Sequence, residues 1–423
     1  MNPKSRIRNP KLLVWGLLLL VVIAGSAEFV PFELCGSSSG QAADSLRGQS
    51  PRYLLHAVGR TPFGPTSLAG GRIRGLPAQE KPSSSGLSGA GPVVHGTPDD
   101  PLRDPREVHL RHVRQLTFGG QNAEAYFDSD GKRLIFQSTR PPYTCDQIFG
   151  MNADGSDVHL ISTGKGRTTC GYFYPDGEHV LYSSTHLAGP ECPPRPDYSK
   201  GYVWGVYPSL QIFYATWHGE ILKQLTLGPG YNAEATFSYD GKRIVFTSMR
   251  DGDLDIYTMN PDGNGVKRLT QELGYDGGPF FSPDGQWIVY RAHHPTSQDE
   301  IARYKSLLAE GLVEPLQMDL FVMRADGSER KQITQLGGAS FAPSFFPDSR
   351  RIIFASNYEN PGTSQFELYT IDRDGGPLER ITEVGGFQAF PMFSPDGKRL
   401  VFASNRNAKQ PHEINIYIAD WVP

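Results

Sequence analysis

The sequence shows no excess of basic residues. It has 41 Lys and Arg against 45 Asp and Glu, and its formal net charge is −4. Proteins that bind nucleic acids usually carry a basic patch or a basic overall balance. Nucleic acid is therefore not expected among the partners of this chain.

Long apolar runs and metal-binding spacings are also absent from the sequence pattern. The N-terminal region lacks a strictly apolar stretch of about 20 residues, the length that a membrane-crossing helix needs. No H-x-x-x-H or H-E-x-x-H spacing of metal ligands occurs. We therefore assign no catalytic residue, no metal ligand and no cofactor from the sequence.

Glycine and proline, by contrast, are abundant. The chain has 47 Gly and 34 Pro, and 38% of its 423 residues are hydrophobic. This turn-rich balance is typical of many short strands rather than of helices. We predict an all-β fold.

The first 35 residues have the pattern of an export signal. An apolar run over 12–24 is followed by small residues at 25–27 and preceded by four basic residues, Lys4, Arg6, Arg8 and Lys11. This order predicts a signal peptide or an uncleaved N-terminal membrane anchor over 1–35. Lipidation at Cys35 is less favoured, because Leu34 stands where a lipoprotein box has a small residue.

The next segment, 36–106, is dominated by Gly, Ser, Pro, Ala and Arg. It has no sustained apolar period of either a helix or a strand, so it cannot bury a core. We interpret it as a flexible, low-complexity tether between the N-terminal segment and the remainder of the chain.

From residue 107 the sequence repeats six times. Each copy has an aromatic anchor with an Asp three residues later, and the anchors are Phe127, Phe173, Phe237, Phe281, Phe345 and Phe393. Their spacing implies a unit of about 45 residues, with insertions in the second and fourth copies. Each unit contains four strand-like segments joined by turns, several of them Asp-Gly hairpin turns. The pattern predicts a six-bladed β-propeller over 107–423.

The ends of this region indicate how the ring closes. The fourth strand of a unit ends in an apolar-Thr pair, but the last unit stops at 414–423 without such a strand. The signature occurs instead before the first unit, at Arg114 to Thr117. We expect 113–117 to pair with 414–418 and complete the sixth blade, which leaves no open edge.

The segment FSPDGKRLVFASNR at 393–406, with its five variants, resembles the WD-like repeat of TolB propellers. The resemblance covers about 107–423. It implies an exported, membrane-tethered binding or scaffolding module of the cell envelope. An envelope protein, a peptide or an acidic glycan would be its partner, and the expected location is periplasmic or extracytoplasmic. We expect a monomer.

Two alternative functions remain open. Related propellers include polysaccharide lyases that hold a metal through histidines, and His186, His293 and His294 lie in candidate loops. Similar repeats also gate prolyl-oligopeptidase-like hydrolases, so the chain could serve a separate hydrolase. A binding module is favoured over an enzyme, because no hydrolase domain follows the last blade.

The two insertions are expected on one face of the propeller. Both 186–208 and 293–317 fall in loops between second and third strands, which lie on the same face as the loops entering the innermost strands. In the later insertion, Ser297 and Glu300 form a capping box and Gly311 is a stop signal. We predict a helix at about 298–310, in blade 4.

Three of the four cysteines map to this face. Exported proteins form disulfides in oxidising compartments. We predict one disulfide, in which Cys192 pairs with either Cys145 or Cys170.

Alignment of the six units places three sets of residues at the channel mouth. The first set is Asn122, Thr168, Asn232, Asp276, Ser340 and Gln388. The second set is Glu124, Cys170, Glu234, Gly278, Ala342 and Phe390. The third set, at the ends of the second strands, is Arg140, His186, Arg250, His294, Tyr358 and Arg406.

Two interpretations of these sets stay open. In the first, ion pairs within a blade, Glu124 with Arg140 and Glu234 with Arg250, hold the mouth in shape. In the second, the mouth binds a polar ligand: carboxylates face a cation or ammonium group and arginines face carboxylates, with calcium a less favoured occupant. The candidate ligand-binding residues are Asn122, Glu124, Arg140, His186, Asn232, Glu234, Arg250, Asp276, His294 and Arg406.

Overall fold

The computed structural model describes residues 91–228 and 230–423, all of which belong to one compact unit, 31–423. The predicted signal or anchor over 1–35 lies outside the described residues, as does the tether up to residue 90. Within the described part, no helix is long and apolar enough to cross a membrane.

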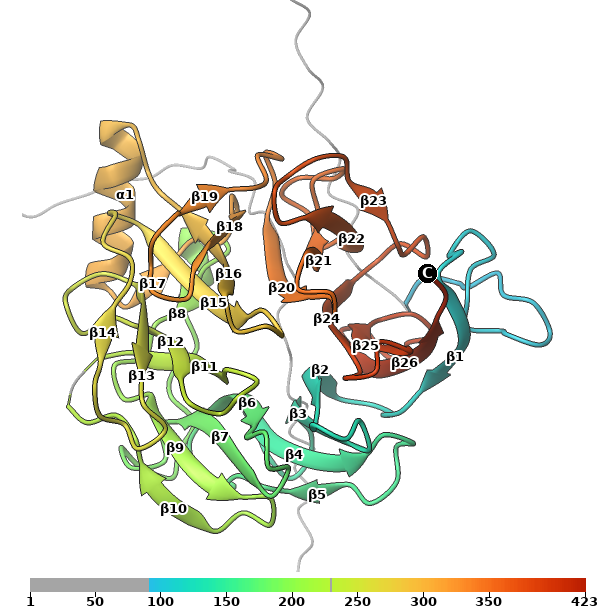
Figure 1. The fold of residues 1–423 in the computed structure, drawn as a ribbon, viewed down its shortest axis with the longest axis horizontal. Helices are drawn as coiled ribbons and strands as arrows, with labels where there is room; N and C mark the ends of the chain where they lie inside the picture. The colour runs from blue at the N-terminus through green and yellow to red at the C-terminus, as the bar shows by residue number, and fades with distance from the viewer. Residues whose placement is uncertain (1–90, 229) are drawn as a thin grey trace, which may run out of the picture. The chain divides into compact units, whose positions relative to one another are not determined.

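Six four-stranded antiparallel sheets follow one another around a ring, with their first strands nearest the centre (Figure 1). Blades 1 and 2 comprise β2 (Gln121–Phe127), β3 (Arg133–Thr139), β4 (Gln147–Asn152) and β5 (His159–Leu160), then β6 (Thr168–Phe173), β7 (His179–Ser184), β9 (Gln211–Thr216) and β10 (Ile221–Gln224). Blades 3 and 4 comprise β11 (Asn232–Phe237), β12 (Ile244–Ser248), β13 (Asp255–Met259) and β14 (Lys267–Arg268), then β15 (Tyr275–Phe281), β16 (Trp287–His293), β18 (Asp319–Arg324) and β19 (Lys331–Gln332). Blade 5 comprises β20 (Ser340–Phe345), β21 (Arg351–Ser356), β22 (Glu367–Asp372) and β23 (Glu379–Arg380). The prediction of a six-bladed, all-β propeller is confirmed.

Blade 6 is built from both ends of the repeat region. Its sheet has the order β1-β26-β25-β24, with β1 (Leu110–Gln115), β24 (Gln388–Phe393), β25 (Arg399–Ser404) and β26 (Asn415–Trp421). β1 runs antiparallel to β26, and Arg114 lies opposite Ile418. The outer strand of this sheet therefore comes from the N-terminal side of the first repeat.

The core lies between neighbouring blades. The second strands carry continuous apolar runs, and Leu134, Ile135 and Phe136 of β3 are fully buried. A strand covered by sheets on both faces cannot alternate apolar with polar residues, which explains these runs. The anchoring aromatics, such as Phe237 and Phe393, are buried in the same layers.

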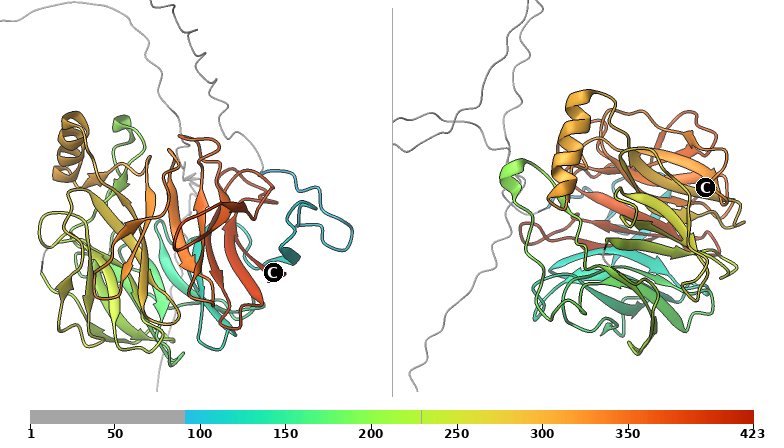
Figure 2. Two further views of the ribbon diagram at one scale, coloured as in Figure 1. Left: turned by 45° about the horizontal axis from the view of Figure 1, so that its top comes forward. Right: turned by 90° about the vertical axis from the view of Figure 1, so that its left-hand side faces the viewer.

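The two insertions meet each other. β8 (Trp204–Gly205) pairs antiparallel with β17 (Leu312–Val313), so the second-blade and fourth-blade insertions form a small sheet. The short 3₁₀ helix η1 (Tyr198–Lys200) lies beside α1 (Gln298–Ala309), as both views of Figure 2 show. Lys200 also forms an ion pair with Glu310, just after α1. The expectation that both insertions share one face is confirmed, and we call this side the insertion-bearing face.

The predicted helix in blade 4 is also confirmed. Ser297 accepts a hydrogen bond from the backbone N–H of Glu300, and the Glu300 side chain accepts one from the backbone N–H of Ser297. The helix ends at Ala309, and Gly311 follows in the left-handed region at φ 71°. Tyr304 and Leu307 are its buried residues.

Residues 91–109 contact blade 6. The amide of Gly91 donates to the carbonyl of Ala408 at 3.2 Å, and Leu102 packs against the apolar core of blades 5 and 6. Asp100 accepts hydrogen bonds from the amides of His112 and Val113 at the start of the ring. The last part of the predicted tether, 91–106, therefore lies on the propeller.

Candidate functional site

A β-bulge occurs at the same place in all six innermost strands. In each bulge, two residues of the innermost strand lie opposite one residue of the second strand. In blade 1, for example, Ala123 pairs with Gln137 and Tyr126 pairs with Ile135, so two residues of β2 lie between these pairs but only one residue of β3 does. The first bulge residue always has a positive φ, between 51° and 59°. We call these six residues the inner ring: Glu124, Cys170, Glu234, Gly278, Ala342 and Phe390. Five are not glycine, and for each of them this left-handed conformation costs about 1–2 kcal/mol.

The bulge overturns the predicted ion pairs within blades. Regular alternation would place Glu124 on the same face of β2 as Asn122, toward Arg140. The extra residue turns the Glu124 side chain away, so Arg140 donates instead to Asn122 Oδ1 at 2.6 Å. The prediction that Arg140 pairs with Glu124 is therefore wrong, as is the corresponding pair in blade 3.

Blade 3 repeats this arrangement. Arg250 donates to Asn232 Oδ1 at 3.0 Å and to Ser248 Oγ at 3.0 Å. Its guanidinium also lies 5.2 Å from the ring centre of Phe246 and 5.0 Å from that of Tyr257. Such cation–π contacts stabilise a partly buried guanidinium. Arg250 and Asn232 therefore join the first two strands of the blade.

Arg406 has the same position in blade 6 but is fully buried. It forms an ion pair with Glu107, and both side chains are 0% exposed. It also donates to the carbonyl of Leu102 at 2.9 Å and to Gln388 Oε1 at 3.2 Å. The prediction that Arg406 faces a ligand is wrong, because every direction around it is occupied by the chain. Sequence reasoning missed Glu107, which lies just before β1.

Asp276 is also turned into the protein. Its Oδ1 is 3.1 Å from His294 Nε2, and the Asp276 side chain is 1% exposed. Burial lowers the pKa of His294, but the hydrogen bond and charge of Asp276 raise that pKa further than burial lowers it. Asp276 and His294 therefore pair within blade 4, with Asp276 buried and His294 partly exposed.

The three candidate histidines do not converge. His186 lies in blade 2, where its Nδ1 is 2.9 Å from Ser184 Oγ, whereas His293 and His294 lie at the end of β16 in blade 4. Burial lowers the pKa of both His186 and His293. Across residues 91–228 and 230–423, no group of three or more His, Cys, Asp and Glu could hold a metal ion.

Glu234 is held by contacts between blades. It forms an ion pair with Arg291 of blade 4 and accepts hydrogen bonds from Thr247 Oγ1 at 2.8 Å and from the amide of Gly278 at 2.9 Å. A Cβ on Gly278 would lie 2.1 Å from Arg291 Nη1. The only glycine of the inner ring therefore makes room for the guanidinium. Sequence reasoning missed Arg291, although a glycine at this one ring position was a signal.

The blade 2 insertion contacts the same guanidinium. The Trp204 ring lies 5.3 Å from the Arg291 guanidinium and 6.4 Å from the Tyr275 ring. Tyr275 in turn accepts a hydrogen bond from Arg291 Nη2 at 2.7 Å. The paired insertions are thus attached to the inner ring through a desolvated Arg–Glu pair.

Glu124 differs from the other carboxylates of the site. Among the described residues it forms no ion pair, and its side chain is partly exposed. Burial, and then the charge of Glu234, raise the pKa of Glu124 to about 7. The Cys170 thiol donates a hydrogen bond to it, and burial followed by the charge of Glu124 raises the pKa of Cys170 well above its usual value. The other charged groups near Glu124 are Arg291 and Asp146.

Aromatic side chains gather beside the inner ring on blades 5 and 6. The ring centres of Phe341 and Phe390 are 5.6 Å apart, those of Phe341 and Phe366 4.8 Å, and those of Phe366 and Phe387 5.9 Å. Phe387 and Phe390 remain partly exposed. The inner ring therefore has a polar side on blades 1 to 3, and an aromatic side where Phe390 of blade 6 is flanked by these other rings of blades 5 and 6.

A further aromatic cluster lies below this ring. Tyr126, Tyr172 and Phe280 come from blades 1, 2 and 4, and their ring centres are 5.5–5.9 Å apart. Blades 1 and 4 lie on opposite sides of the propeller, so these contacts cross its centre. We call these three side chains the aromatic floor of the inner ring.

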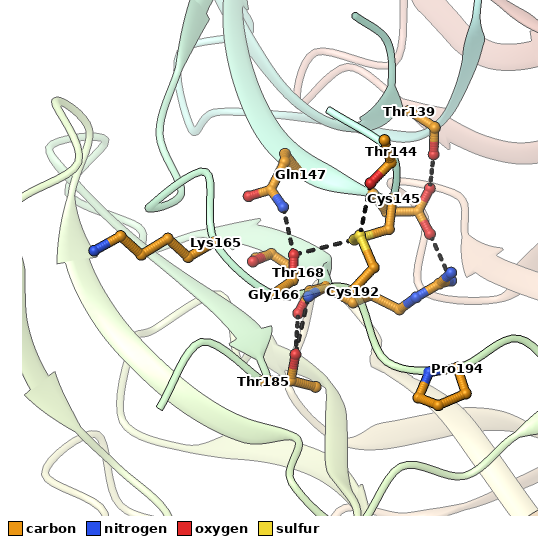
Figure 3. Close-up of a disulfide and its surroundings, with 12 residues drawn as sticks. Thr139, Thr144, Cys145, Gln147, Lys165, Gly166, Thr168, Thr185, Cys192 and Pro194 are labelled. Atoms are coloured by element: carbon orange, nitrogen blue, oxygen red, sulfur yellow. Dashed lines mark hydrogen bonds and ion pairs between the residues drawn. A yellow bond between two sulfur atoms is a disulfide. The ribbon is translucent and has the colours of Figure 1, made fainter. Parts of the chain in front are cut away.

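One disulfide joins blades 1 and 2 at this face. Cys145 bonds to Cys192, and Figure 3 shows Gln147 and Gly166 beside the bridge. Gln147 Nε2 donates to the carbonyl of Gly166 at 2.7 Å. The prediction of a disulfide involving Cys192 is confirmed, and Cys145 is its partner. Cys170 remains a free thiol of the inner ring.

Six four-stranded sheets around a common centre define a six-bladed β-propeller. The family model of the TolB beta propeller domain matches residues 206–310 and 308–420, about half of the chain, so this protein belongs to the TolB β-propeller family. The predicted resemblance is thereby confirmed.

Solved structures show the same architecture. A protein assigned as TolB from Agrobacterium tumefaciens is 20% identical, with 74% of this chain and 97% of that chain covered and a TM-score of 0.50. TolB from Acinetobacter baumannii is 18% identical, with 72% and 64% covered and a TM-score of 0.47. An oligogalacturonate lyase in complex with manganese is 14% identical, with 73% and 93% covered and a TM-score of 0.45. No curated protein matches the chain. At 20% identity the likeness to the Agrobacterium tumefaciens protein shows the fold alone.

Proposed function

We propose that this protein is an extracytoplasmic binding module that takes a cationic group of a partner peptide or protein at the inner ring. The observation that carries this proposal is Glu124, a partly exposed carboxyl without an ion-pair partner among the described residues. A carboxylate in partly desolvated surroundings gains most from a cation supplied by a ligand. The aromatic floor and the paired insertions support entry from the insertion-bearing face.

The engaged arginines decide between the ligand classes. Arg140 and Arg250 are bonded to Asn122 and Asn232, and Arg406 is fully buried. Two of these arginines are therefore engaged within their blades and the third is inaccessible, so an acidic glycan has less support than a basic peptide. Calcium also has little support, because the carboxylate of Glu234 already has partners within the chain.

An extracytoplasmic location is supported by two independent features. The Cys145–Cys192 disulfide is a bond of oxidising compartments. The export pattern of residues 1–35 supports the same compartment and a membrane attachment ahead of the propeller. The partner we propose is accordingly a protein or peptide of the cell envelope.

The proposal is tested by selecting peptides that bind the full-length protein and measuring the effect of Glu124→Gln on their affinity. We expect peptides that carry a cationic group, and a loss of affinity of about tenfold or more in the variant. Asp130→Asn is the matched control, since Asp130 lies at the exposed turn of the same blade and its side chain is 68% exposed. Selection of acidic peptides, or equal affinity for the wild type and Glu124→Gln, would contradict the proposal.

A further inference from the structure

We propose that Glu124 and Phe390 form a site for a fully alkylated ammonium group, such as a trimethylammonium. This inference rests on the proposed function, because it names the chemistry of the cation that the inner ring takes. It concerns the boundary between blades 6 and 1, where the polar and aromatic sides of the inner ring adjoin.

The two residues have equivalent positions in neighbouring blades. β24 and β2 are the first strands of blades 6 and 1, and Phe390 and Glu124 are the first residues of their bulges. Phe390 packs against the core cluster that contains Ala125 and Tyr126, directly after Glu124 in the chain. Both side chains are partly exposed. An aromatic ring and a carboxyl therefore hold equivalent positions on the innermost strands of neighbouring blades.

A bulky aromatic residue occupies a strained backbone position at Phe390. Its φ is 54°, a conformation that glycine adopts without strain and that Gly278 adopts at the same position in blade 4. A bulky aromatic residue with positive φ is uncommon, and such strain clusters at binding sites. The neighbouring Phe341 and Phe387 add two further rings at 5.6 and 6.5 Å from Phe390.

The hydrogen-bond acceptors around Glu124 favour an alkylated cation over a primary ammonium. Gln137 Oε1 already accepts from Thr169 Oγ1 at 2.5 Å and from the amide of Cys170 at 3.3 Å. Both carboxylate oxygens of Glu234 are also occupied. A primary ammonium has three N–H donors, and of the three side-chain acceptors Glu124, Gln137 and Glu234 only Glu124 is not already held by a stronger donor of the chain. Buried donors without acceptors are costly, whereas a trimethylammonium has none.

The aromatic side supplies what an alkylated cation needs. Ring faces attract cations through their quadrupole, and the methyl groups of such a cation gain from contact with apolar surface. Quaternary ammonium groups are recognised by such combinations of aromatic rings, commonly completed by a carboxylate. The polar and aromatic sides of the inner ring meet both requirements at one place.

The experiment measures binding of choline and tetramethylammonium to the full-length protein by calorimetry. Ethanolamine serves as the primary-ammonium counterpart, and 3,3-dimethylbutanol as the neutral counterpart of choline. We expect both alkylated cations to bind at least tenfold more tightly than either counterpart. Glu124→Gln should weaken choline binding at least tenfold. Phe390→Leu, which keeps apolar bulk but removes the ring face, should weaken it about threefold to tenfold.

Asp130→Asn is again the matched control and should bind choline like the wild type. Circular dichroism shows whether each variant is folded, and Phe387→Leu replaces Phe390→Leu if the latter is not. Equal affinity for choline and ethanolamine, or unchanged choline binding in the folded phenylalanine variant, would overturn the inference. If peptides still bind in a Glu124-dependent manner in that case, the proposed function stands without it. If neither peptides nor ammonium compounds bind, the proposed function itself fails.

Discussion

Glu124→Gln should stabilise the protein at alkaline pH and leave its stability at acidic pH unchanged. In the folded protein, burial and the nearby charge of Glu234 raise the pKa of Glu124 from 4.5 to about 7. The folded state therefore holds the Glu124 proton more tightly than the unfolded state does. The free energy of unfolding must then fall as the pH rises from about 4.5 to about 7. Glutamine carries no titratable proton, so the free energy of unfolding of the variant does not fall in this way as the pH rises.

The size of the effect follows from the same pKa. A rise from 4.5 to about 7, at about 1.4 kcal/mol for each pH unit, corresponds to about 3 kcal/mol. The Glu124 side chain is partly exposed, and the amide of glutamine must also be desolvated, so we expect about 1–2 kcal/mol at pH 8. The groups around Glu124 that set this value are Cys170, Glu234, Arg291 and Asp146.

Urea unfolding of the wild type and the variant at pH 4 and pH 8 measures this difference. At pH 8 the variant should have the higher free energy of unfolding, and at pH 4, below the unfolded-state pKa, the two should agree within error. Asp130→Asn should show no comparable gain at pH 8. A variant that is less stable than the wild type at both pH values would refute the reasoning, because it would show that Glu124 is a structural strut. The predicted gain would mean that the chain keeps an ionisable residue where it costs stability, which is typical of binding sites.

Three further perturbations test the packing around the site. Arg406→Met leaves a buried carboxylate unpaired and should lower the free energy of unfolding by about 3–5 kcal/mol. Arg250→Met breaks only bonds to neutral oxygens and should lower it by about 1–2 kcal/mol in urea unfolding. Equal losses would show that the buried ion pair contributes no more stability than the neutral hydrogen bonds. Gly278→Ala places a Cβ 2.1 Å from a guanidinium nitrogen, whereas in Gly285→Ala, at φ 68°, the new Cβ meets no atom within 4 Å. Thermal unfolding should therefore show that Gly278→Ala lowers the free energy of unfolding by about 1–3 kcal/mol more than Gly285→Ala does. Cys192→Ser should lower the free energy of unfolding by about 2–4 kcal/mol and abolish its dependence on reductant, and a reductant effect that persists in this variant would contradict the assigned bridge.

Much of the architecture could be predicted from residues close together in the chain. The Asp-Gly turns set the hairpins, because glycine adopts positive φ and aspartate bonds to its own backbone. The capping box at Ser297 and Glu300 marked the start of α1 to the residue. Six repeats of one such unit are enough to indicate a propeller, since no single unit can bury its apolar face alone.

The residues at the centre of the ring could not be assigned in this way. Their orientation depends on the bulge at Glu124 and its five counterparts, and a bulge changes the face of every following side chain without changing the local sequence pattern. The partners of the charged residues also come from distant segments: Arg291 reaches Glu234 from the next blade, and Glu107 reaches Arg406 across 299 residues. Short-range periodicity in the sequence therefore specifies strands and turns. The pairing of buried charges depends instead on which blades become neighbours in the ring, because an ion pair becomes strong only when contact between segments removes water from both charges.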